Sequence, residues 1–358
     1  MTNVSTLGKS LEQVERLKAL QAQLGTLQTQ LTSGKKAEIF SGLGSDVLAS
    51  KKARANFNAL DNYLNNITIA DRRITMTTNL VSEIRTQTEG LLGSMEIQTQ
   101  EGEYEMETLG DYAKNLQGFL FNLINEKDGD RYLLGGANST TKPLTDTGSL
   151  DSYTRKQITD WVNGTITTDQ FMATYKDKTQ LTDTIVGYDA QIASGNTKNV
   201  TVRVDDNAEI DYTVMANADP FRNVMVAISM IKNIDSILDE VTLDAGDPMT
   251  TVTAPGATQQ EQNENFYRVF NDLAAMLNKG LDQIDTEHFK LAQAQSQIKQ
   301  IAENHTYEKK ALADTIGQVE DVDINEVALK LSALQIQLEA SYRVTATVSS
   351  LNLASFLS

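Results

Sequence analysis

The residue types that most often carry chemistry are few in this sequence, and their spacing does not bring them together. Cysteine is absent from the 358 residues, which excludes disulfides, thiolate metal ligands and cysteine nucleophiles. The two histidines, His288 and His305, fall on one predicted helix, about 25 Å apart along its axis. They therefore cannot share a metal ion within one chain, and we expect solvated or helix-seam positions for both.

Two other motifs could suggest ligand binding. Glu101, Glu103, Glu105 and Glu107 form an acidic cluster, but it lacks the glycine turn and the ligand spacing of a calcium loop, so a solvated acidic turn is predicted. The segment Gly42-Leu43-Gly44 is followed by no lysine-serine pair that would bind a phosphate. No nucleophile-elbow pattern occurs either. The sequence therefore predicts no catalytic residue, no cofactor, no metal and no enzyme.

Composition restricts the class of partner. The net charge of −17 and the pI near 4.6 argue against nucleic acid or an anionic membrane as the main partner. No stretch approaches the roughly 20 apolar residues that a membrane span requires. The N-terminal residues lack the cationic and apolar regions of a cleaved signal peptide, so export by another route is one expectation. Only four prolines occur, as expected of long uninterrupted helices.

Both ends of the chain have the pattern of amphipathic helices. Leucines recur at alternating spacings of three and four near the N-terminus, and a similar apolar spacing returns near the C-terminus. Such a stripe lies on one face of a helix, which must bury it against a partner. We therefore predict that the two ends pair and that assembly is the function. The stripe residues are Leu17, Leu20, Leu24, Leu27, Leu31, Val327, Leu331, Leu334 and Leu338.

Longer helices are predicted inside these two. The first should end at Ser33-Gly34, and the next, capped by Ser45 or Asp46, should extend to about Leu92, followed by a run from Thr108 to about Asn125. After Pro255-Gly256, apolar residues recur every seven positions and only His305 interrupts them, which predicts a helix packed in a bundle. Asp323 and Glu326 fit a pair that caps the last helix. The seven-residue column is Phe270, Leu277, Ile284, Leu291, Ile298, Leu312 and Val319.

The segment between these helices has a different pattern. Glycines and turn-forming residues become frequent from Asp128. Alternating valines and Ile210, Tyr212 and Val214 flank Asp205-Asp206-Asn207, which predicts a β-hairpin with one buried face. The segment from Gln157 to Phe171 suits a short helix or a small satellite core. We therefore predict an inserted β-rich domain.

The expected fold is mainly α, with an inserted β-rich domain and with N- and C-terminal helices that pair in a coiled coil or bundle. Five segments are expected: an N-terminal helix for assembly, the two halves of a helical domain with the β-rich domain inserted between them, and a C-terminal helix for assembly. Their boundaries are residues 1–44, 45–127, 128–256, 257–320 and 321–358.

Several stretches carry a resemblance to a known family. Leu27 to Lys36 looks like a helix that ends in a Ser-Gly-Lys turn, Asp321-Val322-Asp323 matches a break before the last helix, and Ser350 to Leu357 is a closing apolar segment. In this order and at these distances from the termini, they resemble the bacterial flagellin and flagellar hook-associated protein family.

One stretch separates two types within that family. Asp128 to Asn138, followed by Lys142-Pro143-Leu144, resembles the segment by which hook–filament junction proteins leave the helical domain, and the hairpin followed by Asp219-Pro220-Phe221 is similar to that type as well. Proteins of this family usually have an Asp-Asp-Pro or Asp-Asp-Ala run after the first helix. In this sequence the run is reduced to Gly44-Ser45-Asp46-Val47-Leu48. A junction protein is favoured, and a filament flagellin is the alternative.

The resemblance implies a structural, extracellular subunit of the bacterial flagellum. It implies export through the flagellar channel without a cleaved signal peptide, an export chaperone, and assembly with copies of itself and with other axial proteins such as flagellin and hook-associated protein. It adds the closing segment to the predicted assembly interface, through Leu351, Leu353, Phe356 and Leu357.

Two readings from other classes stay open at this stage. An enzyme or ligand-binding module could lie in Asp128 to Pro255, where a sugar bound against Tyr153, Trp161 and Tyr175 would support it. A coiled-coil adaptor that remains inside the cell is the other, and fractionation would distinguish it.

Overall fold

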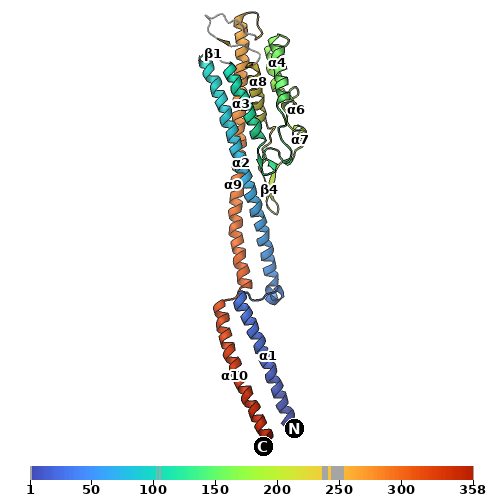
Figure 1. The fold of residues 1–358 in the computed structure, drawn as a ribbon, viewed down its shortest axis with the longest axis vertical. Helices are drawn as coiled ribbons and strands as arrows, with labels where there is room; N and C mark the ends of the chain where they lie inside the picture. The colour runs from blue at the N-terminus through green and yellow to red at the C-terminus, as the bar shows by residue number, and fades with distance from the viewer. Residues whose placement is uncertain (1, 102, 105, 236–240, 243–253, 358) are drawn as a thin grey trace. The chain divides into compact units, whose positions relative to one another are not determined.

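The fold comes from a computed structural model that describes residues 2–101, 103–104, 106–235, 241–242 and 254–357 (Figure 1). Side chains are described for residues 8, 11–96, 106–234, 254–258 and 260–347. The chain divides into two compact units, each containing residues from both halves of the sequence. We call residues 1–62 with 303–358 the terminal unit, and residues 63–302 the central unit.

The terminal unit is built around two antiparallel helices, α1 (Thr2–Ser33) and α10 (Ile324–Leu357), which lie side by side in Figure 1. Helix α1 ends at Gly34, whose φ of 69° is a left-handed conformation that glycine adopts without strain, so the predicted glycine stop is confirmed. The 3₁₀ helix η1 (Phe40–Asp46) then leads into α2 (Val47–Glu101), whose first turns belong to this unit.

The last turns of α9 (Gln259–Glu320) also belong to the terminal unit, and a short break separates them from α10. Asp323 caps α10, since its Oδ1 accepts from the backbone N–H of Asn325 at 2.8 Å and of Glu326 at 3.3 Å. The side chain of Glu326 is 2.6 Å from Lys330 one turn further on. The predicted helix start is therefore confirmed, with Asp323 as the capping residue.

The central unit places α2 antiparallel to α9 and adds α3 (Met106–Ile124) and α8 (Asp219–Asp235) beside them. The predicted seven-residue column is buried here, from Phe270 through Leu277, Ile284 and Leu291 to Ile298. Charged side chains join the edges of the helices, as where Arg85 Nε donates to Asp285 at 2.7 Å. The seam predicted from the sequence is thus a core of packed helices.

The prediction of a β-rich inserted domain is wrong. The hairpin exists, with Val202 and Val204 buried, but the described strands pair only in small two-stranded sheets. The described part of the segment contains more helix than strand, and Thr182 and Asp189 cap two of its short helices where a β-rich domain was expected. The short helix expected within Gln157 to Phe171 is present as the end of one helix and, after Thr167, the start of the next. The short helices are α4 (Gly148–Val162), α5 (Thr168–Lys176), α6 (Asp183–Val186) and α7 (Ala190–Ala193). The strands are β1 (Glu103–Tyr104) with β6 (Val241–Thr242), β2 (Lys127–Asp128) with β3 (Arg131–Tyr132), and β4 (Thr201–Asp205) with β5 (Ala208–Asp211).

Helix α8 was not predicted, because nearly all of its faces are buried. Every residue from Val224 to Ile231 is buried, so the segment lacks the polar stripe from which an amphipathic helix is recognised. The polar side chains of α8 form hydrogen bonds with α4. Asp151 of α4 accepts from Ser229 at 2.8 Å and from Lys232 at 2.6 Å. Burial would raise the pKa of Asp151, but hydrogen bonds from Gln117, Lys232 and Ser229 outweigh burial and lower it. This network fixes how α4 docks on α8.

A small aromatic core lies between α4 and α5. Trp161, the single tryptophan, is fully buried and stacks on Phe171 with ring centroids 4.8 Å apart, and its Nε1 donates to Thr168 at 3.1 Å. Tyr175 packs edge-on against Phe171 and donates its hydroxyl to Asp272. Trp161 and Tyr175 are two of the three aromatic residues that could have lined a sugar-binding pocket. In this structure both are buried in the core.

We expect Trp161→Ala to lower the free energy of unfolding by about 3–5 kcal/mol, because it leaves a cavity and an unpaired Thr168 hydroxyl. Urea denaturation followed by circular dichroism measures the change. Phe289→Ala is the matched control: that ring is 71% exposed, so its loss should change stability by no more than about 0.5 kcal/mol. Equal losses for the two variants would contradict the packing described here.

Candidate assembly interface

The leucine stripes of the two terminal helices meet each other within one chain. Leu20 of α1 is buried with Leu334 and Leu338 of α10, and the three form one apolar cluster. Leu17, Leu24 and Leu27 are partly buried and pack against this cluster. At one edge of the pair, Gln21 donates its side-chain amide to the hydroxyl of Tyr342 at 2.7 Å. The pairing of the two ends expected from the sequence is present in the structure.

The other predicted interface residues divide into two groups. Val327 is buried, whereas Leu31 and Leu331 are half-buried. Leu351, Leu353, Phe356 and Leu357 lie outside the residues whose side chains are described. The assignment of these thirteen residues to an assembly interface therefore stays a prediction.

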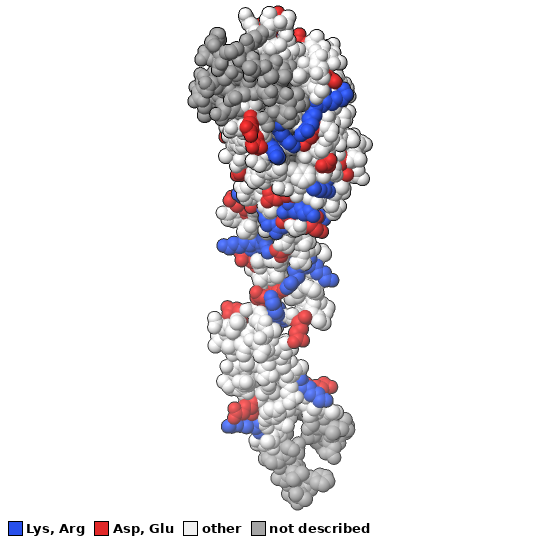
Figure 2. Space-filling model, turned by 45° about the horizontal axis from the view of Figure 1, so that its top comes forward, with Lys and Arg blue, Asp and Glu red and all other residues white. Residues whose placement is uncertain are grey.

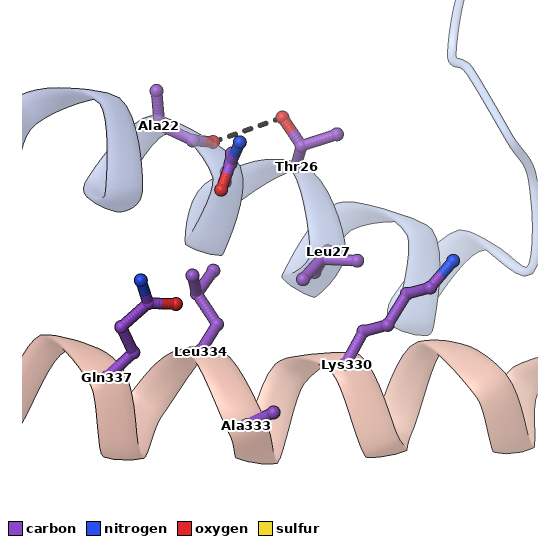
Figure 3. Close-up of a pocket in the computed structure, with 8 residues that line it drawn as sticks. Ala22, Thr26, Leu27, Lys330, Ala333, Leu334 and Gln337 are labelled. Atoms are coloured by element: carbon purple, nitrogen blue, oxygen red, sulfur yellow. Dashed lines mark hydrogen bonds between the residues drawn. The ribbon is translucent and has the colours of Figure 1, made fainter. Parts of the chain in front are cut away.

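A groove runs along one side of the helix pair, between α1 and α10. Its larger hollow has a volume of about 530 Å³. Figure 3 shows Leu334 of α10 pointing toward α1, between the long side chains of Gln337 and Lys330. Ala22 and Thr26 of α1 also line the hollow, but their side chains project away from α10. The hydroxyl of Thr26 donates to the carbonyl oxygen of Ala22, so it does not project into the hollow as a free donor. The lining therefore combines apolar residues with the long polar side chains of Gln23, Lys330 and Gln337.

A second hollow of about 240 Å³ continues this groove toward the N-terminal end of α1. Arg16 and Leu20 line it, and together with Gln23 and Leu27 of the first hollow they follow one helix face at spacings of four and three. On α10, Lys330, Ala333, Gln337, Ala340 and Val344 form the corresponding stripe. We call the two hollows together the side groove.

Helix α10 carries a second apolar stripe on the face opposite the leucine seam. Leu329 is 73% exposed and Ile336 is 69% exposed, although both are large aliphatic side chains. They are seven residues apart and therefore lie on one line along the helix. We call Leu329 and Ile336 the outer ridge. Neither residue belongs to the predicted leucine stripe, and their seven-residue spacing beside that stronger seam is the sequence signal that could have identified them.

A buried carboxylate holds the base of the helix pair. Glu320, at the end of α9, accepts from Arg54 Nε at 2.7 Å and Nη2 at 2.5 Å, and from the hydroxyl of Ser50 at 2.6 Å. Lys35 lies 3.6 Å from the same carboxylate and also pairs with Asp321. The hydrogen bond from Arg54, more than any other contact, lowers the pKa of Glu320 to about 2.

Backbone hydrogen bonds join the same segments as the side chains around Glu320. Lys36 N–H donates to the carbonyl oxygen of Glu320 at 2.7 Å, and Val322 N–H donates to that of Gly34 at 3.0 Å. The segments that follow α1 and precede α10 are therefore joined in the same place as the ends of α2 and α9. This junction sets where the two terminal helices begin to pair.

Residues 4–138 match the bacterial flagellin N-terminal helical region, and residues 275–357 match the bacterial flagellin C-terminal helical region. Together these matches cover more than half of the chain, including α1, most of α9 and α10. The chain belongs to the bacterial flagellin family. The resemblance noted from the terminal segments is confirmed.

Two solved structures are similar to this flagellin-family chain at low identity. The crystal structure of Bacillus cereus FlgL has a TM-score of 0.47 and 13% identity, over 75% of this chain and 98% of that one. The structure of a putative flagellar hook-associated protein from Vibrio parahaemolyticus has a TM-score of 0.41 and 11% identity, over 76% of this chain and 97% of that one. A search of curated proteins gave no match.

Membership of the flagellin family makes this chain a structural, non-enzymatic protein of the extracellular bacterial flagellum, whose family members assemble with other axial proteins.

The residues considered as possible ligands lie apart from one another. His305 is buried within the seam of α9, and His288 is half-buried. Among the described residues there is no group of three or more side chains that could hold a metal ion. Nor does any helix among them have the length and apolarity needed to cross a membrane. Glu101, Glu103 and Glu105 lie outside the described side chains, and Glu107 is exposed.

Charge is distributed unequally between the two units of this flagellin-family chain. The terminal unit contains 12 basic and 13 acidic residues, a net charge of −1, whereas the central unit contains 19 and 35, a net charge of −16. The face of α1 and α10 seen in Figure 2 is mostly uncharged, with charged side chains in isolated groups. Electrostatic repulsion between copies should therefore be weak at the terminal unit.

We expect Glu320→Gln to lower the free energy of opening of the terminal unit by about 2 kcal/mol at pH 7, because Arg54 loses its anionic partner. The lowered pKa means that the charge of Glu320 stabilises the fold above about pH 4.5, and that this contribution is lost as the pH falls toward 2. Hydrogen exchange of the α1 and α10 amides measures the difference.

Asp321→Asn is the control for that measurement. Its side chain is 50% exposed, so loss of its ion pair with Lys35 should cost no more than about 0.5 kcal/mol. Equal effects of the two variants at pH 7, or an effect of Glu320→Gln that persists unchanged at pH 2, would contradict the role given to the buried carboxylate.

Proposed function

We propose that this chain is a hook–filament junction protein that assembles through its terminal helix pair. In this proposal the interface comprises the leucine stripes of α1 and α10 and the closing segment with Leu351, Leu353, Phe356 and Leu357. Its partners are further copies of the chain and other axial proteins of the flagellum. The chain would reach them through the flagellar export channel, with an export chaperone.

The observation that carries assembly is the burial pattern of α10. One face of this helix packs on α1 through Leu334 and Leu338, while Leu329 and Ile336 on the opposite face are largely exposed. A helix that is apolar on opposite faces is typical of one that is buried on both. Since α1 covers only one of them, a further partner is needed for the other.

The choice of junction protein over filament flagellin is supported by the central unit. The segment from Asp128 to Asn138 resembles the junction type, and here it forms a tight β2–β3 turn with Gly129 at a φ of 65°. The β4–β5 hairpin then leads toward Asp219-Pro220-Phe221 at the start of α8. A filament flagellin is the second candidate, since the flagellin family includes both.

Electron microscopy of the purified chain, concentrated and seeded with short flagellar fragments, tests the proposal. A junction protein should add only a short cap to hook ends and should otherwise stay monomeric or form short oligomers. Long filaments of flagellar diameter would make the chain a filament flagellin. The absence of any engagement with hook or filament ends would contradict both candidates.

Deletion of residues 338–358 should leave a folded monomer that no longer adds to flagellar fragments. It removes Leu338 from the leucine cluster and takes away the closing segment, while the core of the central unit is untouched. Circular dichroism and sedimentation establish that the monomer is folded, and seeded addition is scored by microscopy. Normal addition by the deletion variant would show that the C-terminal helix is not the interface.

A further inference from the structure

The side groove and the outer ridge have matching dimensions. The centre of the second hollow lies about eight residues from the centre of the first along both α1 and α10. This separation is about 12 Å at the helical rise. Leu329 and Ile336 are seven positions apart, or about 10.5 Å. Each hollow has room for an aliphatic side chain, since even the smaller one measures about 240 Å³.

We propose that the outer ridge of one copy occupies the side groove of the next. Leu329 enters the hollow lined by Ala22, Thr26 and Ala333, and Ile336 enters the second hollow, beside Arg16 and Ala340. The occupant is a second copy of this chain. This inference rests on the proposed function for the direction of packing, because copies in an axial structure share one polarity and their helices then run parallel.

The charges of the terminal unit favour such an occupant. With a net charge of −1, two terminal units approach each other almost without repulsion, unlike the central units at −16. Ala22 and Ala333, two small residues of the lining, leave room for Leu329 in this arrangement. Large side chains opposite small ones permit close packing of helices.

The geometry also gives the shift between neighbours. The first hollow is centred four to five residues beyond Leu329 along α10, and the second lies at a similar distance beyond Ile336. A parallel neighbour is therefore displaced by about 7 Å along the helix axis. Ridge and groove are different surfaces, so the contact is heterologous, and repeating it generates a ring or a helical array in place of a closed dimer.

Cysteine cross-linking tests this contact, and the chain has no native cysteine to interfere. Two full-length single-cysteine variants, Thr26→Cys and Leu329→Cys, are mixed, concentrated alone or with flagellar fragments, and oxidised. We expect a cross-linked dimer in the mixture well above that of either variant alone. Gln28→Cys, at the other edge of α1, and Gln13→Cys, at the second hollow, replace Thr26→Cys in the control mixtures.

Each outcome decides the inference. A dimer favoured with Thr26→Cys supports it, whereas equal or stronger dimers with Gln28→Cys or Gln13→Cys overturn it. If the wild type adds to flagellar fragments without the Thr26–Leu329 cross-link, the inference fails and the proposed function stands. If the cross-link forms but the wild type adds to no flagellar fragment, the contact stands and the proposed function fails.

Substitution gives a second, independent measurement. Leu329→Gln should raise the concentration needed for association about tenfold, because one aliphatic side chain is no longer buried in the groove. The side chain is 73% exposed in the single chain, so folding should be unchanged. Phe289→Gln, an equally exposed apolar position in the central unit, is the control. Equal effects of the two substitutions would overturn the ridge contact.

Discussion

The buried carboxylate of Glu320 is the contact on which the terminal unit depends. It binds the first turns of α2 through Ser50 and Arg54 and lies close to Lys35, which follows α1. A carboxylate in this position is stable only because several donors surround it, since an unpaired buried charge is very costly. Polar bonding therefore fixes the base of the helix pair, and the leucine seam and the side groove begin from a defined point. The two stripes would otherwise be free to slide past each other by a turn, because leucines repeat along both helices.

The parts of the fold with a regular period could be predicted from the sequence. The column from Phe270 to Ile298 and the leucine stripes were found because core residues recur at helical spacing. Helix α8 was missed for the opposite reason: it is buried on nearly all sides, and burial without periodicity leaves no stripe. The β-rich prediction failed at Thr182 and Asp189, since the same residue types cap helices and terminate strands.

The candidate interface was predictable only in part. Spacing located the seam, but the side groove arises from the way Ala22, Thr26 and Ala333 flank it, and that depends on which edges of the two helices face outward. The partnership of Glu320 with Arg54 joins residues 266 positions apart, and local pattern carries no information about such a contact. The charge difference between the two units also required the structure, because each unit combines residues from both halves of the chain.

The antiparallel pairing of α1 with α10 has a consequence for when the fold can form. Gln21 and Tyr342 are 321 positions apart, so the first helix made has its partner at the far end of the chain. Closing so long a loop is slow compared with forming helices locally. A chain that emerges from its N-terminus onward will hold the stripe of α1 uncovered until α10 arrives. The central unit can condense before then, so the terminal unit is the later of the two to form. A chain without α10 would leave this step undone, and exposure of the α1 stripe would distinguish such a chain from one that contains both helices.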